Sequence, residues 1–487
     1  MSRSPHKVSS LRCAPVRYFA GTPASGGGST FTLTRENGRP KAPVRIVHLG
    51  LGNFFRAHTC WYTEHAPDAS DWGIAAFCGR SATHVADLRA QDDVYTLMIQ
   101  GRLGARAEDA PEYSTEVISS LSAVHTAGEL EAWRGYFADP NVCLVTSSIT
   151  EGGYIRDAGG NLDLVEAVRD DVEALRADPL SGIVTTAPGK FVAGLLTRRA
   201  SGAGPITFVP CDNVVSSGAM VRTVVTQMAE MVDLTLLDWI EANVGFVSTM
   251  VDRITPNPTP ADFERVTELT GYADPAAVVT EPFTEWVLEG EFRTPHPAWA
   301  EAGAQFVDDI IPFEHRKLWL LNGAHSLMAY TGPLHGHETV QQAIADSVIF
   351  GWVNQWWDEA SGHLGLPDED IRAYRQALLD RFSNPAMTDV LSRIAADGSQ
   401  KIPIRFIPAI QAELDSGRTP EAGLRAIAAW VWHLRGRSTP VNDARQAEVL
   451  ALGEGTLEES VAKVLAFLGL DATLLPEVTA LAHDLLP

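Results

Sequence analysis

The chain has 487 residues, more than one ordinary domain and enough to bury two sizeable cores. Hydrophobic residues make up 45% and charged residues 20%, the balance of a folded globular protein. The formal net charge of −23 argues against a nucleic-acid partner, because such proteins concentrate Lys and Arg against the phosphate backbone. No apolar run approaches the roughly 18 residues of a membrane helix, so we expect no membrane partner.

The N-terminal 43 residues differ in composition from the rest of the chain. They begin with the polar, basic MSRSPHKVSS and continue with the Gly/Ser-rich GTPASGGGST. This composition predicts a mobile N-terminal arm over residues 1–43, without the apolar core of a secretory signal. The five cysteines are scattered in the sequence, which indicates reduced thiols in a cytoplasmic protein and neither a disulfide framework nor a metal site. They are Cys13, Cys60, Cys78, Cys143 and Cys211.

Strand and helix patterns alternate through the first 300 residues. The β-branched run VRIVHLG ends in glycine and is typical of a buried parallel strand. Further strands are predicted at IAAFCG, VYTLMI, VCLVTSSI, ITFVPCDN and VGFVSTMVD. Helical patterns separate them, at AHTCWYTEHA, LDLVEAVRDDVEAL and GAMVRTVVTQMAEMV. This alternation predicts a doubly wound α/β domain over residues 44–305.

The character of the chain changes after about residue 310. Long amphipathic helical patterns dominate and strand signals nearly vanish. Residues 306–487 are therefore predicted to form a mainly α-helical C-terminal domain, which we expect to carry substrate-binding and catalytic residues.

A glycine-rich turn comes after the first predicted strand. Gly50 and Gly52 permit a tight turn and close approach of the backbone to a pyrophosphate. Phe55 occupies the place of a third glycine, and Arg56 is the next residue. A dinucleotide site and a simple strand-to-helix turn are both compatible with this pattern.

The second predicted strand ends where an NAD enzyme often carries an acidic residue for the ribose. Here Gly79, Arg80 and Ser81 come next, and no acid occurs until Asp87. Because Arg80 can bind a 2′-phosphate, these residues by themselves weakly favour NADP over NAD, or do not discriminate strongly between the two cofactors.

The segment EHRKLWLLNGAHS places Lys317, Asn322 and His325 in an apolar, helix-prone run. At about 100° per residue in an α-helix, His325 falls about 80° and Asn322 about 140° from Lys317, so all three can line one wide face. Burial lowers a lysine pKa toward the range of a general base, and Asn and His are donors to an alcohol or carbonyl oxygen. The alternative is a partly exposed lysine, a capping asparagine and a core histidine.

Several motifs together resemble the mannitol dehydrogenase family of polyol-specific long-chain dehydrogenases and reductases. The resemblance extends from about Val44 to the C-terminus. The motifs are IVHLGLGNFFRAH, TEGGY, CDNVVSSG, STMVDRITP, EPFTEWVLE, FVDDIIPFEHRKLWLLNGAHS and RFSNPAMTDVLSRIAADGSQKIP. The resemblance implies a Rossmann-type N-terminal domain, a mainly helical C-terminal domain, NAD as cofactor and no metal.

The resemblance also implies roles for individual residues. Lys317 would be the general base, Asn213 and Asn322 would polarise the reacting oxygen, His325 would position the substrate, and Glu314 would relay the proton of the base to water. Asp252, Arg393 and Lys401 would bind substrate. The cofactor-binding residues would be Gly50, Gly52, Asn53, Phe54, Arg56 and Glu151.

The expected activity is NAD-dependent interconversion of a polyol and a ketose, with D-mannitol and D-fructose as the first choice. Reduction of D-fructuronate to D-mannonate is the alternative, so the expected partner is a small polyol, ketose or hexuronate. A non-catalytic dinucleotide-sensing protein is a third possibility. It is disfavoured because a sensor has no need for a buried lysine beside two amides.

Overall fold

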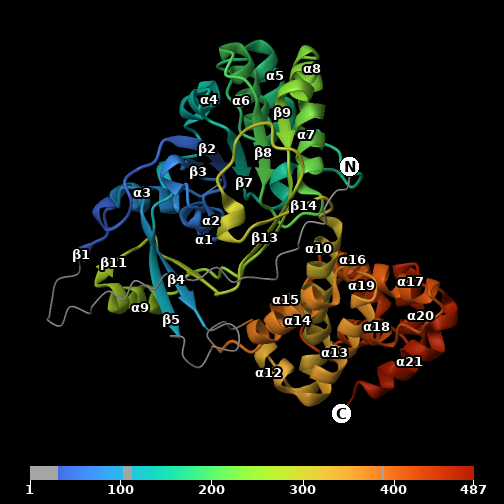
Figure 1. The fold of residues 1–487 in the computed structure, drawn as a ribbon. Coiled ribbons are helices and arrows are strands. Elements are labelled where there is room, and N and C mark those ends of the chain that lie inside the picture. Colours follow the sequence, from blue (N-terminus) through green and yellow to red (C-terminus); the bar gives the residue numbers. More distant parts are fainter. Residues whose placement is uncertain (1–30, 80, 102–111, 386–388, 487) are drawn as a thin grey trace, which may run out of the picture. The chain divides into compact units, whose positions relative to one another are not determined.

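The structure, a computed structural model, describes residues 31–79, 81–101, 112–385 and 389–486. The described residues form two compact units. The N-terminal unit comprises residues 31–79, 81–100 and 112–310, and the C-terminal unit comprises residues 311–385 and 389–486 together with Gly101. Figure 1 labels helices and strands of both units. Most of the predicted N-terminal arm, residues 1–30, lies outside the described residues.

The last part of the predicted arm, residues 31–43, packs on the N-terminal unit. Strand β1 (Phe31–Thr32) joins a two-stranded parallel pair, and Leu33 is completely buried. The guanidinium of Arg35 donates to the backbone carbonyls of Asp92 and Leu121, at 2.7 and 2.6 Å. Composition could not identify these contacts, because Asp92 and Leu121 lie more than 50 residues from Arg35 in the sequence.

A six-stranded parallel sheet organises the N-terminal unit. Its strands in chain order are β2 (Val44–Leu49), β3 (Gly73–Phe77), β6 (Leu121–His125), β7 (Leu144–Ser147), β8 (Ile206–Pro210) and β9 (Val244–Phe246). Their spatial order is β6-β3-β2-β7-β8-β9, with every pairing parallel. This is the Rossmann order 3-2-1-4-5-6, and its switch point lies between β2 and β7. The predicted Rossmann-type domain is confirmed.

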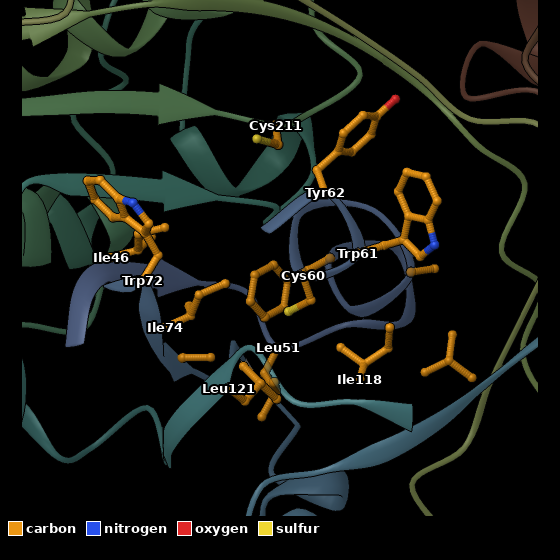
Figure 2. Close-up of a cluster of buried hydrophobic side chains, with 14 of the residues drawn as sticks. Ile46, Leu51, Cys60, Trp61, Tyr62, Trp72, Ile74, Ile118, Leu121 and Cys211 are labelled. Carbon is orange, nitrogen blue, oxygen red and sulfur yellow. The ribbon is translucent and has the colours of Figure 1, made fainter. Parts of the chain in front are cut away.

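Both faces of this sheet are covered, which explains why its strands are continuous apolar runs. Ile46 and Val47 are both completely buried but belong to different core clusters, because successive strand residues point to opposite faces. Figure 2 shows the cluster that contains Ile46, together with Trp72, Ile74 and Leu121. The helices of the unit are α1 (Asn53–Ala57), α2 (Thr59–His65), α3 (Thr83–Ala90), α4 (Leu130–Ala138), α5 (Glu166–Ala177), α6 (Ala187–Ser201), α7 (Ser217–Val232), α8 (Thr235–Asn243) and α9 (Pro260–Thr270).

Two of the predicted strands belong to other sheets. The run VYTLMI forms β4 (Tyr95–Gln100), which pairs with β5 (Tyr113–Ile118) and β12 (Val278–Thr280). The run VGFVSTMVD divides at Val247 into β9 and β10, and β10 (Ser248–Asp252) pairs antiparallel with β13 (Glu285–Glu289) in a sheet with β14 (Gln305–Val307). Strand β6, the third of the Rossmann sheet, was not predicted. Apolar periodicity indicates a strand but does not indicate which sheet it joins.

The C-terminal unit is helical, as predicted. Its α-helices are α10 (Ile311–Arg316), α11 (Ala324–Thr331), α12 (Val340–Ala345), α13 (Ser347–Ser361), α14 (Asp368–Phe382), α15 (Leu391–Ile394), α16 (Gly398–Arg405), α17 (Ile407–Asp415), α18 (Glu421–Leu434), α19 (Gln446–Leu452), α20 (Leu457–Leu468) and α21 (Leu475–Asp484). Helix α11 contacts α13, α15 and α18 and so lies centrally in this unit. Within the described parts of the chain, no helix has both the length and the apolarity needed to cross a bilayer.

Candidate active site

The segment that carries Lys317 is a π-helix. Residues Lys317–Gly323 form η5, which continues α10 and leads directly into α11. The flanking residues Arg316 and Ala324 keep right-handed helical dihedral angles, so the three segments make one uninterrupted helix. The prediction of a helix is confirmed, but its α-helical spacing is wrong between residues 317 and 323. A π-helix hydrogen-bonds residue i to residue i+5, and such turns are frequent at functional sites.

This geometry places Lys317 and Asn322 one turn apart on the same side of the helix, because they are five residues apart. His325 comes three residues after Asn322, a spacing that keeps two side chains on one face of an α-helix. All three are half-buried, whereas Trp319 and Leu320 are buried in the core. The structure therefore brings the lysine, the amide and the imidazole to one face.

Glu314 lies three residues before Lys317 on α10, and so on the same side of the helix. Its side chain is buried, with 6% of its surface exposed. The nearby Arg316 is also buried and lies 4.2 Å from the centre of the Tyr374 ring. Glu314 is therefore a carboxyl group close in sequence and direction to the candidate base.

The two predicted substrate-binding cations of this unit lie on neighbouring helices. Arg393 on α15 is largely exposed and forms an ion pair with Asp389 at 2.5 Å. Lys401 on α16 is half-buried, and its ammonium donates to the carbonyl of Ile394 at 3.2 Å. Burial, with the nearby Arg405 cation as a second cause, lowers the pKa of Lys401.

In the N-terminal unit, Gly50 and Gly52 come after β2 at the switch point of the sheet. Gly50 has φ +117°, and a Cβ there would lie 2.2 Å from the carbonyl oxygen of Ser148. Only glycine allows the ends of β2 and β7 to approach this closely. A Cβ at Gly52 would meet no other atom closer than 4.0 Å. The backbone of Gly52 is thus open to the close approach that a dinucleotide pyrophosphate requires.

The residues after these glycines differ in exposure. Arg56 is completely buried; it donates to the carbonyl of Ala276 and, at 2.7 Å, to Oδ1 of Asn53. Its guanidinium fastens α1 to a distant segment, so we leave Arg56 out of the proposed site. Asn53 is half-buried, and half-buried Phe54 stacks on His58 with a 4.8 Å separation of ring centres. Arg80 lies outside the described residues.

Glu151 lies in a loop after β7, in the short helix η3 (Glu151–Tyr154). Its carboxylate is exposed and pairs with Arg156 at 3.0 Å. The residue before it, Thr150, has φ +66° and ψ 162°, a conformation that non-glycine residues rarely adopt. Such strain persists only where surrounding contacts hold the backbone in place.

Asp212 supplies those contacts, and the sequence-based prediction missed it. Its Oδ1 accepts the amides of Ile149 and Thr150, each at 2.8 Å, and its Oδ2 accepts the hydroxyl of Tyr154. Burial raises the pKa of Asp212 to about 6. The available signal was its position in the CDN motif, directly before Asn213. Asp212 therefore links the loop after β7 to the loop after β8.

Asn213 and Asp252 differ in their surroundings. Asn213 is exposed just beyond the carboxyl end of β8, at the same sheet edge as Gly50. Asp252 ends β10 and is buried, with 5% of its surface exposed. The described residues include no group of three or more His, Cys, Asp or Glu side chains placed to hold a metal ion.

Comparison with known proteins places these features in a family. Residues 44–301 match the family described as the Mannitol dehydrogenase Rossmann domain, and residues 309–482 match the Mannitol dehydrogenase C-terminal domain. The chain is 36% identical over 408 residues to D-mannonate oxidoreductase of Escherichia coli, covering 80% of each chain. It is 34% identical over 403 residues to a polyol:NADP oxidoreductase of Gluconobacter oxydans, again covering 80% of each.

A solved structure of a mannitol 2-dehydrogenase also resembles this chain. The ternary complex of Pseudomonas fluorescens mannitol 2-dehydrogenase with NAD and D-mannitol matches with a TM-score of 0.74 and 31% identity. The match covers 93% of this chain and 96% of that one. The two family matches together span most of the chain, and the chain therefore belongs to the mannitol dehydrogenase family of oxidoreductases.

Proposed function

We propose that this protein is an NAD-dependent dehydrogenase that interconverts a polyol and a ketose, with Lys317 as the general base. The observation that carries the proposal is the shared face of Lys317, Asn322 and His325 in the helix that contains η5. A lysine on the same helix face as amide and imidazole donors suits proton transfer at an alcohol oxygen.

In alcohol oxidation, neutral Lys317 Nζ accepts the proton of the substrate's secondary hydroxyl. The Asn322 amide donates to the oxygen as negative charge develops on it, as the donors of an oxyanion hole do. His325 orients the substrate on the same face. In ketone reduction, protonated Lys317 returns the proton to the oxygen. The bound nicotinamide supplies the complementary chemistry by accepting or donating a hydride.

With the exception of Arg56, the remaining predicted residues keep their proposed roles. Asn213 is the second amide donor, Glu314 relays the proton of Lys317, and Asp252 and Lys401 contact substrate hydroxyls. Gly50 and Gly52 receive the dinucleotide, because open space in front of Gly52 fits the approach of its pyrophosphate.

D-mannitol and D-fructose are our first choice of substrates. Arg393 is already paired with Asp389, so a substrate carboxylate would compete with Asp389 for the guanidinium. A neutral polyol requires no such exchange. The relative named D-mannonate oxidoreductase supports the alternative, reduction of D-fructuronate.

NAD is the proposed cofactor, and the mannitol 2-dehydrogenase complex with NAD supports this choice. The relative named polyol:NADP oxidoreductase makes NADP the competing cofactor. Initial rates with fructose and with fructuronate, each with NADH and with NADPH, distinguish the four combinations. A clear preference for fructuronate or for NADPH would replace the corresponding part of the proposal.

The role of the base is tested with Lys317→Ala. We expect turnover to fall by about 10²- to 10⁴-fold while dinucleotide binding is retained. Lys463→Ala, at an exposed lysine on α20, is the matched control. Turnover of Lys317→Ala within a few-fold of the unmutated enzyme would rule out the proposed base.

The pH dependence of the unmutated enzyme is a second test of the base. The oxidation rate should rise and the reduction rate should fall with increasing pH, because oxidation needs the neutral amine and reduction needs the ammonium.

A further inference from the structure

Two adjacent tryptophans on α13 donate hydrogen bonds to the backbone of the π-helix. The indole Nε1 of Trp356 donates to the carbonyl of Trp319, and that of Trp357 donates to the carbonyl of Leu320, each at 2.8 Å. Both indoles and both acceptor residues are buried. Successive residues of one helix thus reach successive carbonyls of η5.

A third donor comes from α16. Arg405 Nη1 donates to the backbone carbonyl of Asn322 at 3.1 Å and to Oγ of Ser326 at 2.8 Å. Burial lowers the pKa of Arg405 to about 10, so the guanidinium still carries its charge at neutral pH. The backbone carbonyl that accepts from Arg405 belongs to Asn322, the proposed amide donor.

These donors can satisfy backbone carbonyls that a π-helix leaves without their usual hydrogen-bond partner. In an α-helix each carbonyl accepts from the amide four residues later, whereas in η5 the pairing shifts to five residues. Where the pairing changes, carbonyls lose their regular partner, and buried carbonyls require another donor. An indole N–H is suited to this because it donates and never accepts.

Gly323 makes the approach of Trp356 possible. A Cβ at this position would lie 2.7 Å from Trp356 Nε1, closer than a Cβ approaches other atoms. The glycine at the end of η5 therefore leaves room for the indole that reaches the Trp319 carbonyl.

We propose that Trp356, Trp357 and Arg405 are positioning residues that hold residues 317–323 as a π-helix. They thereby keep Lys317 and Asn322 on one face of the helix. The proposal rests on the proposed role of Lys317 as the general base. In an α-helix the same two residues would be about 140° apart, at the opposite edges of one wide face and too far apart in direction to converge on one oxygen.

The first test is Trp357→Phe, which keeps a buried aromatic ring but removes the N–H donor. We expect kcat for alcohol oxidation to fall about 10- to 100-fold, the cost of misplacing a reacting group by about 1 Å. Dinucleotide affinity should stay unchanged. Trp352→Phe is the matched control, since Trp352 is on the same helix and half-buried, with its ring 5.4 Å from His335. Its kcat should stay within about twofold of the unmutated enzyme.

A readout besides rate separates positioning from simple stabilisation. If Asn322 moves away from Lys317, the midpoint of the pH–rate profile for oxidation should shift, whereas a purely structural contact would lower the unfolding temperature and leave that midpoint in place. Arg405→Met and Arg405→Lys give a second, independent pair. Arg405→Met should shift the midpoint, and Arg405→Lys should restore part of both kcat and the midpoint.

The outcomes distinguish this proposal from the proposed function. If Lys317→Ala keeps its turnover, the proposed function fails. If Lys317→Ala is inactive but Trp357→Phe and Arg405→Met keep the kcat and pH midpoint of the unmutated enzyme, the positioning role is overturned. If Trp357→Phe does not fold, the Arg405 pair decides by the same two criteria.

Discussion

Two glycines lie at the switch point of the sheet, Gly50 and Gly52. Alanine at Gly50 is expected to lower both stability and cofactor binding, whereas alanine at Gly52 is expected to lower cofactor binding alone. Gly50→Ala places a Cβ on a residue with φ +117°, 2.2 Å from the carbonyl oxygen of Ser148. The backbone strain costs about 1–3 kcal/mol. Displacing the end of β7 to relieve the overlap costs a further ~1–3 kcal/mol. We expect Gly50→Ala to lower the free energy of unfolding by about 2–6 kcal/mol and to abolish dinucleotide binding.

Gly52→Ala is the matched comparison two residues later. Gly52 has φ −96° and ψ 178°, which alanine adopts without strain, and its Cβ would meet nothing closer than 4.0 Å. The free energy of unfolding should therefore stay within about 0.5 kcal/mol. The added methyl occupies space that the pyrophosphate needs, so dinucleotide affinity should fall about tenfold or more, about 1.4 kcal/mol.

Guanidinium chloride unfolding and titration of dinucleotide fluorescence measure the two effects in the same preparations. Stability of Gly50→Ala equal to that of the unmutated protein would refute the argument from the close approach of β2 and β7. Unchanged dinucleotide affinity in a folded Gly52→Ala protein would refute the placement of the pyrophosphate at this turn.

Two further predictions concern protons and metals. Burial raises the pKa of Asp212 to about 6 from an ordinary 3.8, so this carboxyl stabilises the fold fully below about pH 4 and loses that contribution, up to about 3 kcal/mol, as pH rises toward 6. Asp212→Asn should remove this fall from unfolding free energies measured between pH 4 and 7, and an identical fall in both proteins would show that it has another source. Exhaustive chelation should leave turnover intact, because the ammonium and amides are proposed to serve both proton transfer and charge stabilisation; activity that is lost and then restored by zinc would contradict this.

Local sequence patterns predicted much of the fold. The run VRIVHLG and its glycine turn identified β2 and the start of a Rossmann-type domain, because an apolar strand covered on both faces has a distinctive pattern. The change to helical periodicity near residue 310 identified the helical C-terminal unit. The spacing of Lys317, Asn322 and His325 marked the candidate catalytic helix before any contact was known.

Tertiary structure decided what depends on distant partners. Strand β4 belongs to a second sheet, and its neighbours there, β5 and β12, are segments that its own sequence does not identify. Arg56, adjacent to the glycine turn in sequence, is buried because Ala276 accepts its hydrogen bond from 220 residues away. The orienting contacts of Asp212 likewise join two loops that only the parallel sheet brings together.

The π-helix shows the same division most directly. Helical propensity predicts a helix over the KLWLLNG segment but makes the α-helical form the default, since π-helices are rare. The buried donors that suit a π-turn come from Trp356 and Trp357, 37 residues further along the chain, and from Arg405, 83 residues from Asn322. The sequence by itself therefore determined which side chains are candidates for the chemistry. The packing of α13 and α16 against η5 decided how those side chains are arranged, because buried carbonyls adopt the backbone form for which donors are within reach.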